Sequence, residues 1–348
     1  MLAGDVNPSG KTSDTFVKDL TKTAVFNNTD GTAAGNASSV GTNGKFTYDN
    51  ADDLAASYMG FSGDKVTVTP TFVNYVEGIY VGYKFYETAA AEGAIDYDSM
   101  VAFPFGYGLS YTTFEQKLND VTYKDGKVTV DVTVTNTGDT AGKDVVEVYY
   151  NPPYTDWRHR EGSKNLVAFE KTKKLEPGAS QTVKIEFDDD DMASYDQKDA
   201  KAYVLEQGDY DISIQSDSHH VIDHQKVTVK DTVTYNSDSN THNGDAVAAT
   251  NEFDYAAGDV TYLSRAGHFA NYAKATAAPT NFSMSDEAKA EFTNNSNYDP
   301  KKYDNDSDEM PTTGAKNGLK LYQMYGKDYD DANWDKLLDQ LTSTIWTT

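Results

Sequence analysis

A strict alternation of valine with polar residues constrains the fold more than any other feature of the chain. Over residues 128–134 every second position is valine, and threonine or aspartate stands between the valines. Because successive side chains of a β-strand point to opposite faces, this spacing predicts a strand with one buried face. The same alternation recurs in shorter form at residues 146–150, 183–187 and 210–214.

Turn signals separate these runs, since segments containing Gly or Pro lie at residues 136–142, 176–180 and 206–210. Short alternating strands joined by such turns are typical of an antiparallel β-sandwich. We therefore predict a mainly β fold with one sandwich over residues 116–230. A slip of one residue would move the whole valine set to the other face. The residues predicted to be buried are accordingly Val130, Val132, Val148, Ile185 and Ile212.

The flanks of this sandwich lack such periodicity and predict irregular, partly helical N- and C-terminal connectors. Residues 1–70 are rich in Gly, Asn, Thr and Asp, which indicates a long loop. The aromatic and aliphatic run at 71–88 fits either helix or strand. The stretch "SMSDEAKAEF" predicts a short helix capped by Ser283 or Ser285. Near the end, Asp331 can cap an amphipathic helix whose apolar stripe is Trp334, Leu337, Leu338 and Leu341.

The charge balance limits the classes of partner. The chain has 55 acidic and 30 basic residues, a formal net charge of −25, which repels nucleic-acid phosphates and anionic membranes. No window approaches 18 apolar residues, so we expect no membrane span. With no cysteine, disulfides and thiolate nucleophiles are excluded. The first ten residues lack the basic and apolar regions of a signal peptide, and the localisation stays open.

Metal sites are not favoured. Asp304, Asp306 and Asp308 have the spacing of a calcium loop, but Glu309 and Ala315 stand where that loop needs Gly and Glu. A solvated acidic linker is the favoured interpretation, with these three aspartates as weak metal candidates. The histidines at 219, 220 and 224 cluster at the end of a strand, where the helical spacing of a zinc site does not apply. We expect no cofactor.

Glu77 is a catalytic candidate because it lies among rings in "NYVEGIYVGY". A carboxylate in apolar surroundings is costly unless it is paired or functional. The favoured interpretation is a salt bridge or backbone contact that fixes the connector, and a catalytic role is the alternative.

Carbohydrate-binding candidates lie in the loop "YYNPPYTDWRHREGS". Exposed rings with neighbouring arginines would form a platform for a sugar. The alternative is a loop whose rings pack at an interface. The candidates are Tyr150, Tyr154, Trp157 and Arg158.

Three segments carry a family resemblance. The stretches "LAGDVNPSGKTSDTF", "NYVEGIYVGYKFYET" and "FPFGYGLSYTTFE" resemble successive motifs of glycoside hydrolase family 3, the β-glucosidase family. The strands that follow are similar to its fibronectin type III-like domain. The resemblance implies that residues 103–115 lie at the boundary between two domains, where Gly106 and Gly108 permit close backbone approach and the rings fill the interface. It also implies a partly helical, partly extended connector at 71–88.

The resemblance also implies a domain order. The stretch "MPTTGAKNGLKLYQMYGKDYDDANWDKLLDQLT" resembles the lead-in to the family's barrel, as in members with permuted domains. The expected divisions are the end of an α/β-sandwich domain with a connector (1–115), the fibronectin type III-like sandwich (116–230), a linker region (231–310) and the lead-in to a barrel (311–348).

The same resemblance bears on activity. The family's catalytic aspartate lies in the barrel and its acid/base glutamate upstream of the "GDVNPSG" motif, so neither is expected in this chain. We therefore expect a non-catalytic fragment of a bacterial β-glucosidase-like enzyme that acts as a scaffold, interface or oligomerisation module. The alternative is binding or hydrolysis of β-glucosides through non-standard residues. Expected partners are β-linked glucosides or oligosaccharides in the parent family, a second copy, or the remaining enzyme domains.

Large apolar side chains outside the sandwich also need burial. We expect self-association through the connector, with fold-back onto the sandwich as the alternative. Besides the terminal helix, the side chains concerned are Phe72, Tyr75, Ile79, Tyr83, Phe85, Phe103, Phe105 and Leu109.

Overall fold

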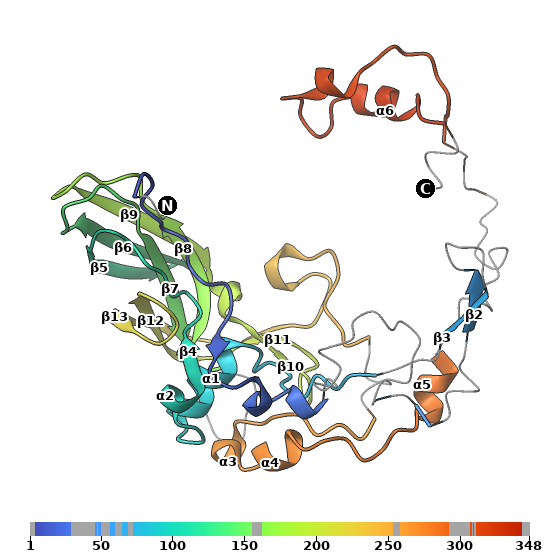
Figure 1. Ribbon diagram of the computed structural model, residues 1–348, viewed down its shortest axis with the longest axis horizontal. Helices are drawn as coiled ribbons and strands as arrows, with labels where there is room; N and C mark the ends of the chain where they lie inside the picture. Colours follow the sequence, from blue (N-terminus) through green and yellow to red (C-terminus); the bar gives the residue numbers. More distant parts are fainter. Residues whose placement is uncertain are drawn as a thin grey trace. The chain divides into compact units, whose positions relative to one another are not determined.

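The computed structural model divides the chain into two units, Met1–Phe292 and Thr293–Thr348, each of which is described by itself (Figure 1). The residues that the structure describes are 4–28, 46, 48–49, 56–59, 65–68, 72–154, 162–252, 258–291, 307, 309 and 311–342.

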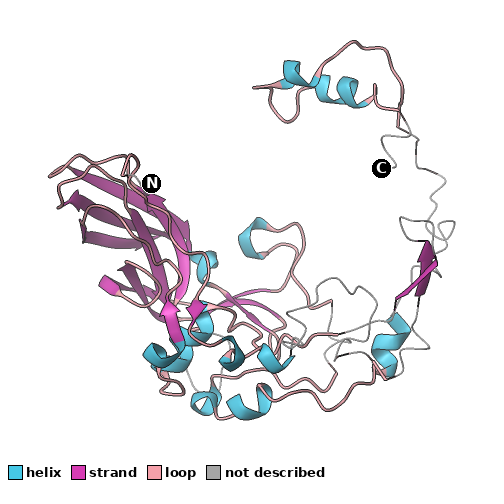
Figure 2. Ribbon diagram, viewed as in Figure 1, coloured by secondary structure: helices cyan, strands magenta, loops and turns pink. Residues whose placement is uncertain are grey.

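Strands dominate the first unit, and its helices are short (Figure 2). The strands are β1 Phe16–Val17, β2 Ala56–Met59, β3 Lys65–Val68, β4 Val101–Phe103, β5 Phe114–Lys124, β6 Lys127–Asn136, β7 Val145–Asn151, β8 Asn165–Lys171, β9 Ser180–Asp188, β10 Ser194–Asp196, β11 Ala202–Leu205, β12 Gly208–Gln215, β13 Val221–Val229 and β14 Val233–Tyr235. The helices are α1 Tyr83–Ala91, α2 Tyr97–Met100, α3 Ala266–Phe269, α4 Tyr272–Ala275 and α5 Asp286–Glu291, and α6 Asn333–Leu338 belongs to the second unit.

Two antiparallel sheets form the predicted sandwich. One has the strand order β5-β6-β9 and the other β13-β12-β7-β8 (Figure 1). Residues of both sheets share one apolar core, in which Val130 of β6 pairs with Ile185 of β9. The alternation of β6 is confirmed, because its four valines are fully buried. The five predicted core residues are all buried, with exposed fractions of 0–5 %.

Strand β5 is one of the two edges of the β5-β6-β9 sheet, and it carries a bulge between Leu118 and Asp120. Just beyond the bulge, the side-chain amide of Gln225 on β13 contacts the backbone of Val121. Its Nε2 donates to the Val121 carbonyl at 2.9 Å, and its Oε1 accepts from the Val121 N–H at 3.3 Å. One glutamine therefore satisfies both backbone groups at this edge position.

A second, smaller core surrounds α1. Gly82, at the N-terminal end of this helix, has φ +59°, a conformation that favours glycine. Within the described part of the segment at 71–88, residues 72–82 are turn and irregular chain, and helix α1 follows from Tyr83. Residues from 258–277 pack on the connector, and the Leu263 N–H donates to the Val76 carbonyl at 2.7 Å. The buried members are Ala24, Tyr80, Phe85, Tyr86, Ala89, Tyr97, Val101, Leu263, Phe269 and Ala275.

The two helices predicted outside the sandwich are present, in shorter form at the C-terminal end. Ser285 Oγ accepts from the Ala288 N–H at 3.1 Å and so caps α5. In the second unit, α6 covers six residues, and Asp331 Oδ1 accepts from the Asn333 N–H at 2.9 Å. Of the predicted apolar stripe, Leu338 is 42 % exposed and the other members are half-buried.

Candidate functional site

The Gly- and aromatic-rich residues 103–108 run between residues 10–12 and the turn that joins β12 to β13. The Gly106 N–H donates to the Thr12 carbonyl at 2.8 Å, and the Thr12 N–H donates to the Tyr107 carbonyl at 2.8 Å. On the other side, the Ser218 N–H donates to the Phe105 carbonyl at 2.8 Å. We call this region the seam: residues 10–12, residues 103–108, α1, β7 and residues 216–219.

Both glycines of the seam lie where a side chain has no room. Gly106 has φ +81°, and a Cβ atom there would lie 2.3 Å from Oε2 of Glu147. A Cβ atom on Gly108 would lie 2.7 Å from the Gly10 carbonyl oxygen. Close backbone approach is therefore found at Gly108, whereas the near neighbour of Gly106 is the carboxyl group of Glu147.

Aromatic rings pack across the seam. Tyr83 of α1 stacks on Phe105 with ring centroids 4.7 Å apart, and it meets Tyr149 of β7 edge-on at 6.1 Å. The Tyr83 hydroxyl also accepts from the Leu166 N–H at 2.8 Å. The rings thus join the connector to the outer face of the sandwich.

A buried carboxyl group lies beneath the Gly106 backbone. Glu147 is 4 % exposed, accepts from the Tyr149 hydroxyl at 2.8 Å and lies 3.8 Å from Lys11 Nζ. Burial raises the pKa of Glu147 to about 7, while the Tyr149 hydrogen bond and the Lys11 charge oppose that rise.

A second buried carboxylate, Glu87 of α1, lies at the other end of the seam. It is 3 % exposed, and its Oε2 lies 3.3 Å from Lys164 Nζ and 3.1 Å from His219 Nδ1. Ser218 Oγ donates to its Oε1 at 3.1 Å. The Tyr97 ring covers His219 at a centroid distance of 3.7 Å. Both buried carboxyl groups therefore contact other parts of the seam.

Glu77, the predicted catalytic candidate, is half-buried, and its Oε2 has no hydrogen-bond partner within the described part of the chain. Burial raises the pKa of Glu77, and a hydrogen bond to its own backbone opposes this. Among the described residues, no ion pair to Glu77 is found.

The predicted carbohydrate platform needs correction at Tyr150. Its side chain is 6 % exposed and packs in the sandwich core, with its ring centroid 6.3 Å from that of Tyr210, because Tyr150 lies two residues after Val148 and therefore on the same inner face of β7. Tyr154 lies under the Arg265 guanidinium, 3.7 Å from carbon to ring centroid. Trp157 and Arg158 lie outside the described residues, as do Asp304, Asp306 and Asp308.

The clustered histidines each contact a carboxylate. Besides His219, His220 Nδ1 lies 2.9 Å from Asp217 Oδ1, and His224 Nδ1 lies 2.7 Å from Asp211 Oδ1. Within the described ranges, no three His, Asp or Glu side chains form a group that could hold a metal ion. In the same residues, every helix falls short of the length and hydrophobicity that a membrane crossing requires.

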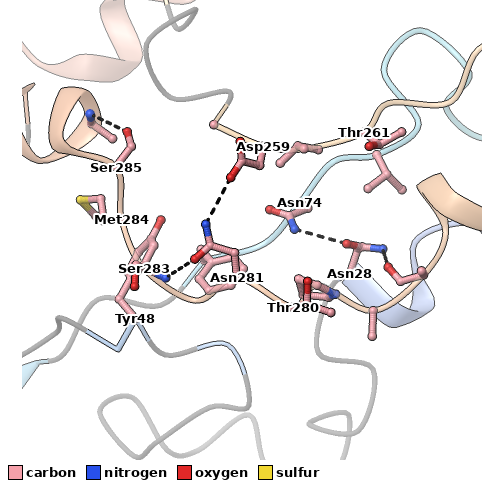
Figure 3. A pocket seen from close by; sticks show the side chains of 18 of the residues that line it. Asn28, Tyr48, Asn74, Asp259, Thr261, Thr280, Asn281, Ser283, Met284 and Ser285 are labelled. Atoms are coloured by element: carbon pink, nitrogen blue, oxygen red, sulfur yellow. Dashed lines mark hydrogen bonds between the residues drawn. The ribbon is translucent and has the colours of Figure 1, made fainter.

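A cavity of about 790 Å³ lies apart from the seam, between the connector and residues 258–288 (Figure 3). Asn28 and Asn74 are on one wall, and Asp259 and Asn281 are on the other. Its walls join residues more than 200 positions apart, so no local pattern of the sequence could have predicted it. The other lining residues are Tyr48, Phe72, Val76, Gly258, Val260, Thr261, Lys274, Ala275, Ala277, Ala278, Pro279, Thr280, Ser283, Met284, Ser285, Glu287 and Ala288.

Comparison with known proteins finds one matching domain and several β-glucosidases of similar sequence. Residues 144–218 match the fibronectin type III-like domain. The chain is 38 % identical over 168 residues to a β-glucosidase of Kluyveromyces marxianus, covering 45 % of this chain and 19 % of the relative. It is 35 % identical over 228 residues to β-glucosidase A of Butyrivibrio fibrisolvens, covering 60 % and 22 %.

Among solved structures, β-glucosidase 3B of Thermotoga neapolitana in complex with α-D-glucose is similar, at 29 % identity and a TM-score of 0.49. The match covers 67 % of this chain and 26 % of that structure. The chain spans about a fifth of the length of the curated relatives it matches.

Proposed function

Because the chain is related to the β-glucosidases of glycoside hydrolase family 3 and carries a fibronectin type III-like domain, we propose that it is a non-catalytic scaffold and interface module of such an enzyme. The observation that carries this proposal is the seam. It attaches α1 and residues 10–12 to β7 through backbone hydrogen bonds, stacked rings and two buried carboxyl groups.

The buried carboxyl groups support a structural role. A retaining glycosidase needs two carboxyl groups about 5–5.5 Å apart, both facing the bond to be cleaved. Glu87 contacts Lys164 and His219, and Glu147 contacts Tyr149, with both nearly inaccessible to solvent. These contacts join the connector to the sandwich and leave little access for a substrate.

Exposed apolar side chains on the part of the chain that precedes the sandwich, residues 16–109, support an interface role. The Phe16 and Phe103 rings of the paired strands β1 and β4 meet at 6.4 Å, yet they are 54 % and 47 % exposed. Leu20 and Leu109 are 72 % and 69 % exposed. Burying a large apolar side chain stabilises by roughly 1.5–3 kcal/mol, so these side chains favour association.

Packing within one chain buries only some of the large apolar side chains that were predicted to need burial outside the sandwich. Phe85 is buried in the core around α1, and Tyr83 and Phe105 stack in the seam. Tyr75, Ile79, Phe103 and Leu109 stay exposed. We therefore propose self-association of the chain through the connector.

Hydrolysis of a chromogenic β-glucoside by the purified chain tests the non-catalytic role. We expect no turnover above the uncatalysed rate. Turnover that disappears in Glu77→Gln but persists in Glu115→Gln would overturn the proposal and identify Glu77 as catalytic. Glu115 is a matched control because it is an exposed glutamate on β5.

Sedimentation at low and high protein concentration tests the interface. We expect a concentration-dependent shift that Phe103→Asp weakens. Phe169→Asp is the control, since Phe169 is 66 % exposed on β8 of the sandwich and should leave the shift unchanged. A monomer at every concentration would contradict self-association.

A further inference from the structure

We propose that Asn243 is a site of spontaneous deamidation, and that its conversion releases the turn at residues 242–244 from the sandwich. Asn243 precedes Gly244 in the segment that follows β14, and its side chain is exposed. This inference goes beyond the scaffold role, and it involves no residue of the seam.

The reaction needs water alone as its co-reactant. The backbone nitrogen of Gly244 loses its proton and attacks the side-chain carbonyl carbon of Asn243. A bond from that nitrogen to the carbon forms, the bond from the carbon to the amide nitrogen breaks, and ammonia leaves. Water then opens the cyclic imide at one of its two carbonyl groups, which gives either aspartate or isoaspartate. Both products carry a carboxylate in place of a neutral amide.

The surroundings of Gly244 leave this attack unhindered. A Cβ atom on Gly244 would meet no atom within 4 Å, so the space around the attacking nitrogen is open. Its N–H has no backbone hydrogen-bond partner within the part of the chain that the structure describes. Glycine has no side chain to block the approach, and it leaves its φ of +70° more readily than any other residue.

The Asn243 amide faces two carboxylates of the 3₁₀-helix η5, Asp189–Met192. The Asn243 backbone N–H donates to Asp190 Oδ2 at 3.0 Å. In the amide orientation that satisfies its hydrogen bonds, Asn243 Nδ2 donates to Asp190 Oδ1 at 3.2 Å and to Asp191 Oδ1 at 3.3 Å. Donors of one residue thus hold the turn against η5.

His242 attaches the same turn to the sandwich. Its ring stacks on Tyr203 of β11 with centroids 3.9 Å apart, and it meets Tyr235 of β14 edge-on at 5.8 Å. Its Nε2 donates to the Asp190 carbonyl at 3.0 Å. Asp190 therefore contacts both His242 and Asn243.

Conversion of Asn243 turns this attraction into repulsion. An amide that donates to two carboxylates becomes a third carboxylate beside them, and a carboxylate can only accept. Lys127 pairs with Asp188 at 2.6 Å, but among the described residues no ion pair reaches Asp190 or Asp191. Uncompensated like charges at such distances repel. We expect the turn to leave η5 and to withdraw the His242 ring from Tyr203.

Peptide mapping by mass spectrometry, on the full chain incubated at mildly alkaline pH, tests the modification site. We expect Asn243 to convert at least about tenfold faster than Asn240, because Asn240 precedes a β-branched threonine. Gly244→Ala should slow the conversion of Asn243 by a similar factor. Asn43 and Asn317 also precede glycine, and the mapping separates conversion there from conversion at Asn243.

NMR of the His242 ring tests the release. In Asn243→Asp and in the converted chain, we expect the ring signals to move from their stacked positions to those of a solvated histidine. Asn240→Asp is the matched control, since it adds the same charge to the same segment at an exposed residue whose Nδ2 donates to the Thr234 carbonyl. It should leave the His242 signals unchanged.

Three results would overturn the proposal. Conversion of Asn243 no faster than that of Asn240 would rule out the modification site. Unchanged His242 signals in both Asn243→Asp and the converted chain would rule out the release. Equal changes in Asn243→Asp and Asn240→Asp would show that added charge alone, and not the contact with Asp190 and Asp191, moves the turn.

Discussion

The sandwich and the seam meet on the same strand, β7, but different interactions hold them. On the inner face of β7, Val146 and Val148 are fully buried in a hydrocarbon core. On its other face, Glu147 and Tyr149 contact the connector through a buried carboxyl group and stacked rings. Apolar burial tolerates many arrangements, whereas a buried charge requires particular partners. Substitutions on the two faces should therefore differ in how much unfolding free energy they cost, in how much added volume they tolerate and in how their cost depends on pH.

The largest effect is expected in the sandwich core. Ile212→Ala should lower the free energy of unfolding by about 4 kcal/mol, since it removes a fully buried side chain and leaves a cavity. The matched control is Ile222→Ala on β13, where the isoleucine is 41 % exposed and the loss should stay below about 1 kcal/mol. Urea unfolding measures both, and equal losses would contradict the assignment of the core.

The seam should be most sensitive at Gly106. Gly106→Ala should cost about 3 kcal/mol, because it combines an unfavourable φ of +81° with a clash against Glu147. Gly178→Ala is the control: its φ is +75°, but a Cβ atom there meets no atom within 4 Å. That substitution should cost about 1 kcal/mol. A similar loss of unfolding free energy in both would show that the seam can relax around a methyl group.

The seam should also depend on pH through Glu147. Its folded pKa of about 7 exceeds its ordinary value of 4.5, so the folded state binds more protons. The stability that Glu147 contributes is therefore fully present below about pH 4.5 and is lost as the pH rises through 7. Between about pH 5.5 and 8.5 this group should remove about 2 kcal/mol of stability.

Glu147→Gln should abolish that loss, because glutamine can still accept from Tyr149 but does not ionise. Glu115→Gln removes the same charge from an exposed position of β5 and corrects for the repulsion within an acidic chain. Denaturant unfolding at both pH values measures the difference. If both variants keep the slope of the unmodified chain, Glu147 does not titrate in the seam.

The smallest effect is expected on the outer face of β6. Thr133→Val should change the free energy of unfolding by less than about 0.5 kcal/mol, because the hydroxyl it loses bonds to Thr182 and Asn119 only at the exposed surface, where water can replace it. The reverse exchange one position away, Val132→Thr, buries a hydroxyl in the core and should cost about 2 kcal/mol. Thermal unfolding of the pair would show whether the two faces of this strand differ as described.

Sequence periodicity predicted the sandwich because its valines repeat along single strands. It did not predict the buried carboxyl of Glu147, although the run "VVEVYY" places large apolar residues on both faces of one strand. A strand with large apolar residues on both faces is typically covered on both. The partners of Glu147 and Glu87 come from distant segments, and spacing along the chain says nothing about such pairs. The same reason hid the cavity, whose amides lie at 28, 74 and 281.

The contact between Gln225 and Val121 has a consequence for aggregation. An unpaired edge strand offers its N–H and C=O groups to a strand of another molecule. At Val121 the Gln225 side chain already occupies both groups, in the manner of a neighbouring strand. Together with the bulge between Leu118 and Asp120, this contact interrupts the row of free backbone groups along β5. Any chain adding to that edge would first have to displace the glutamine, so the sandwich is protected against fibril-like stacking at the edge where its most regular sheet would otherwise continue.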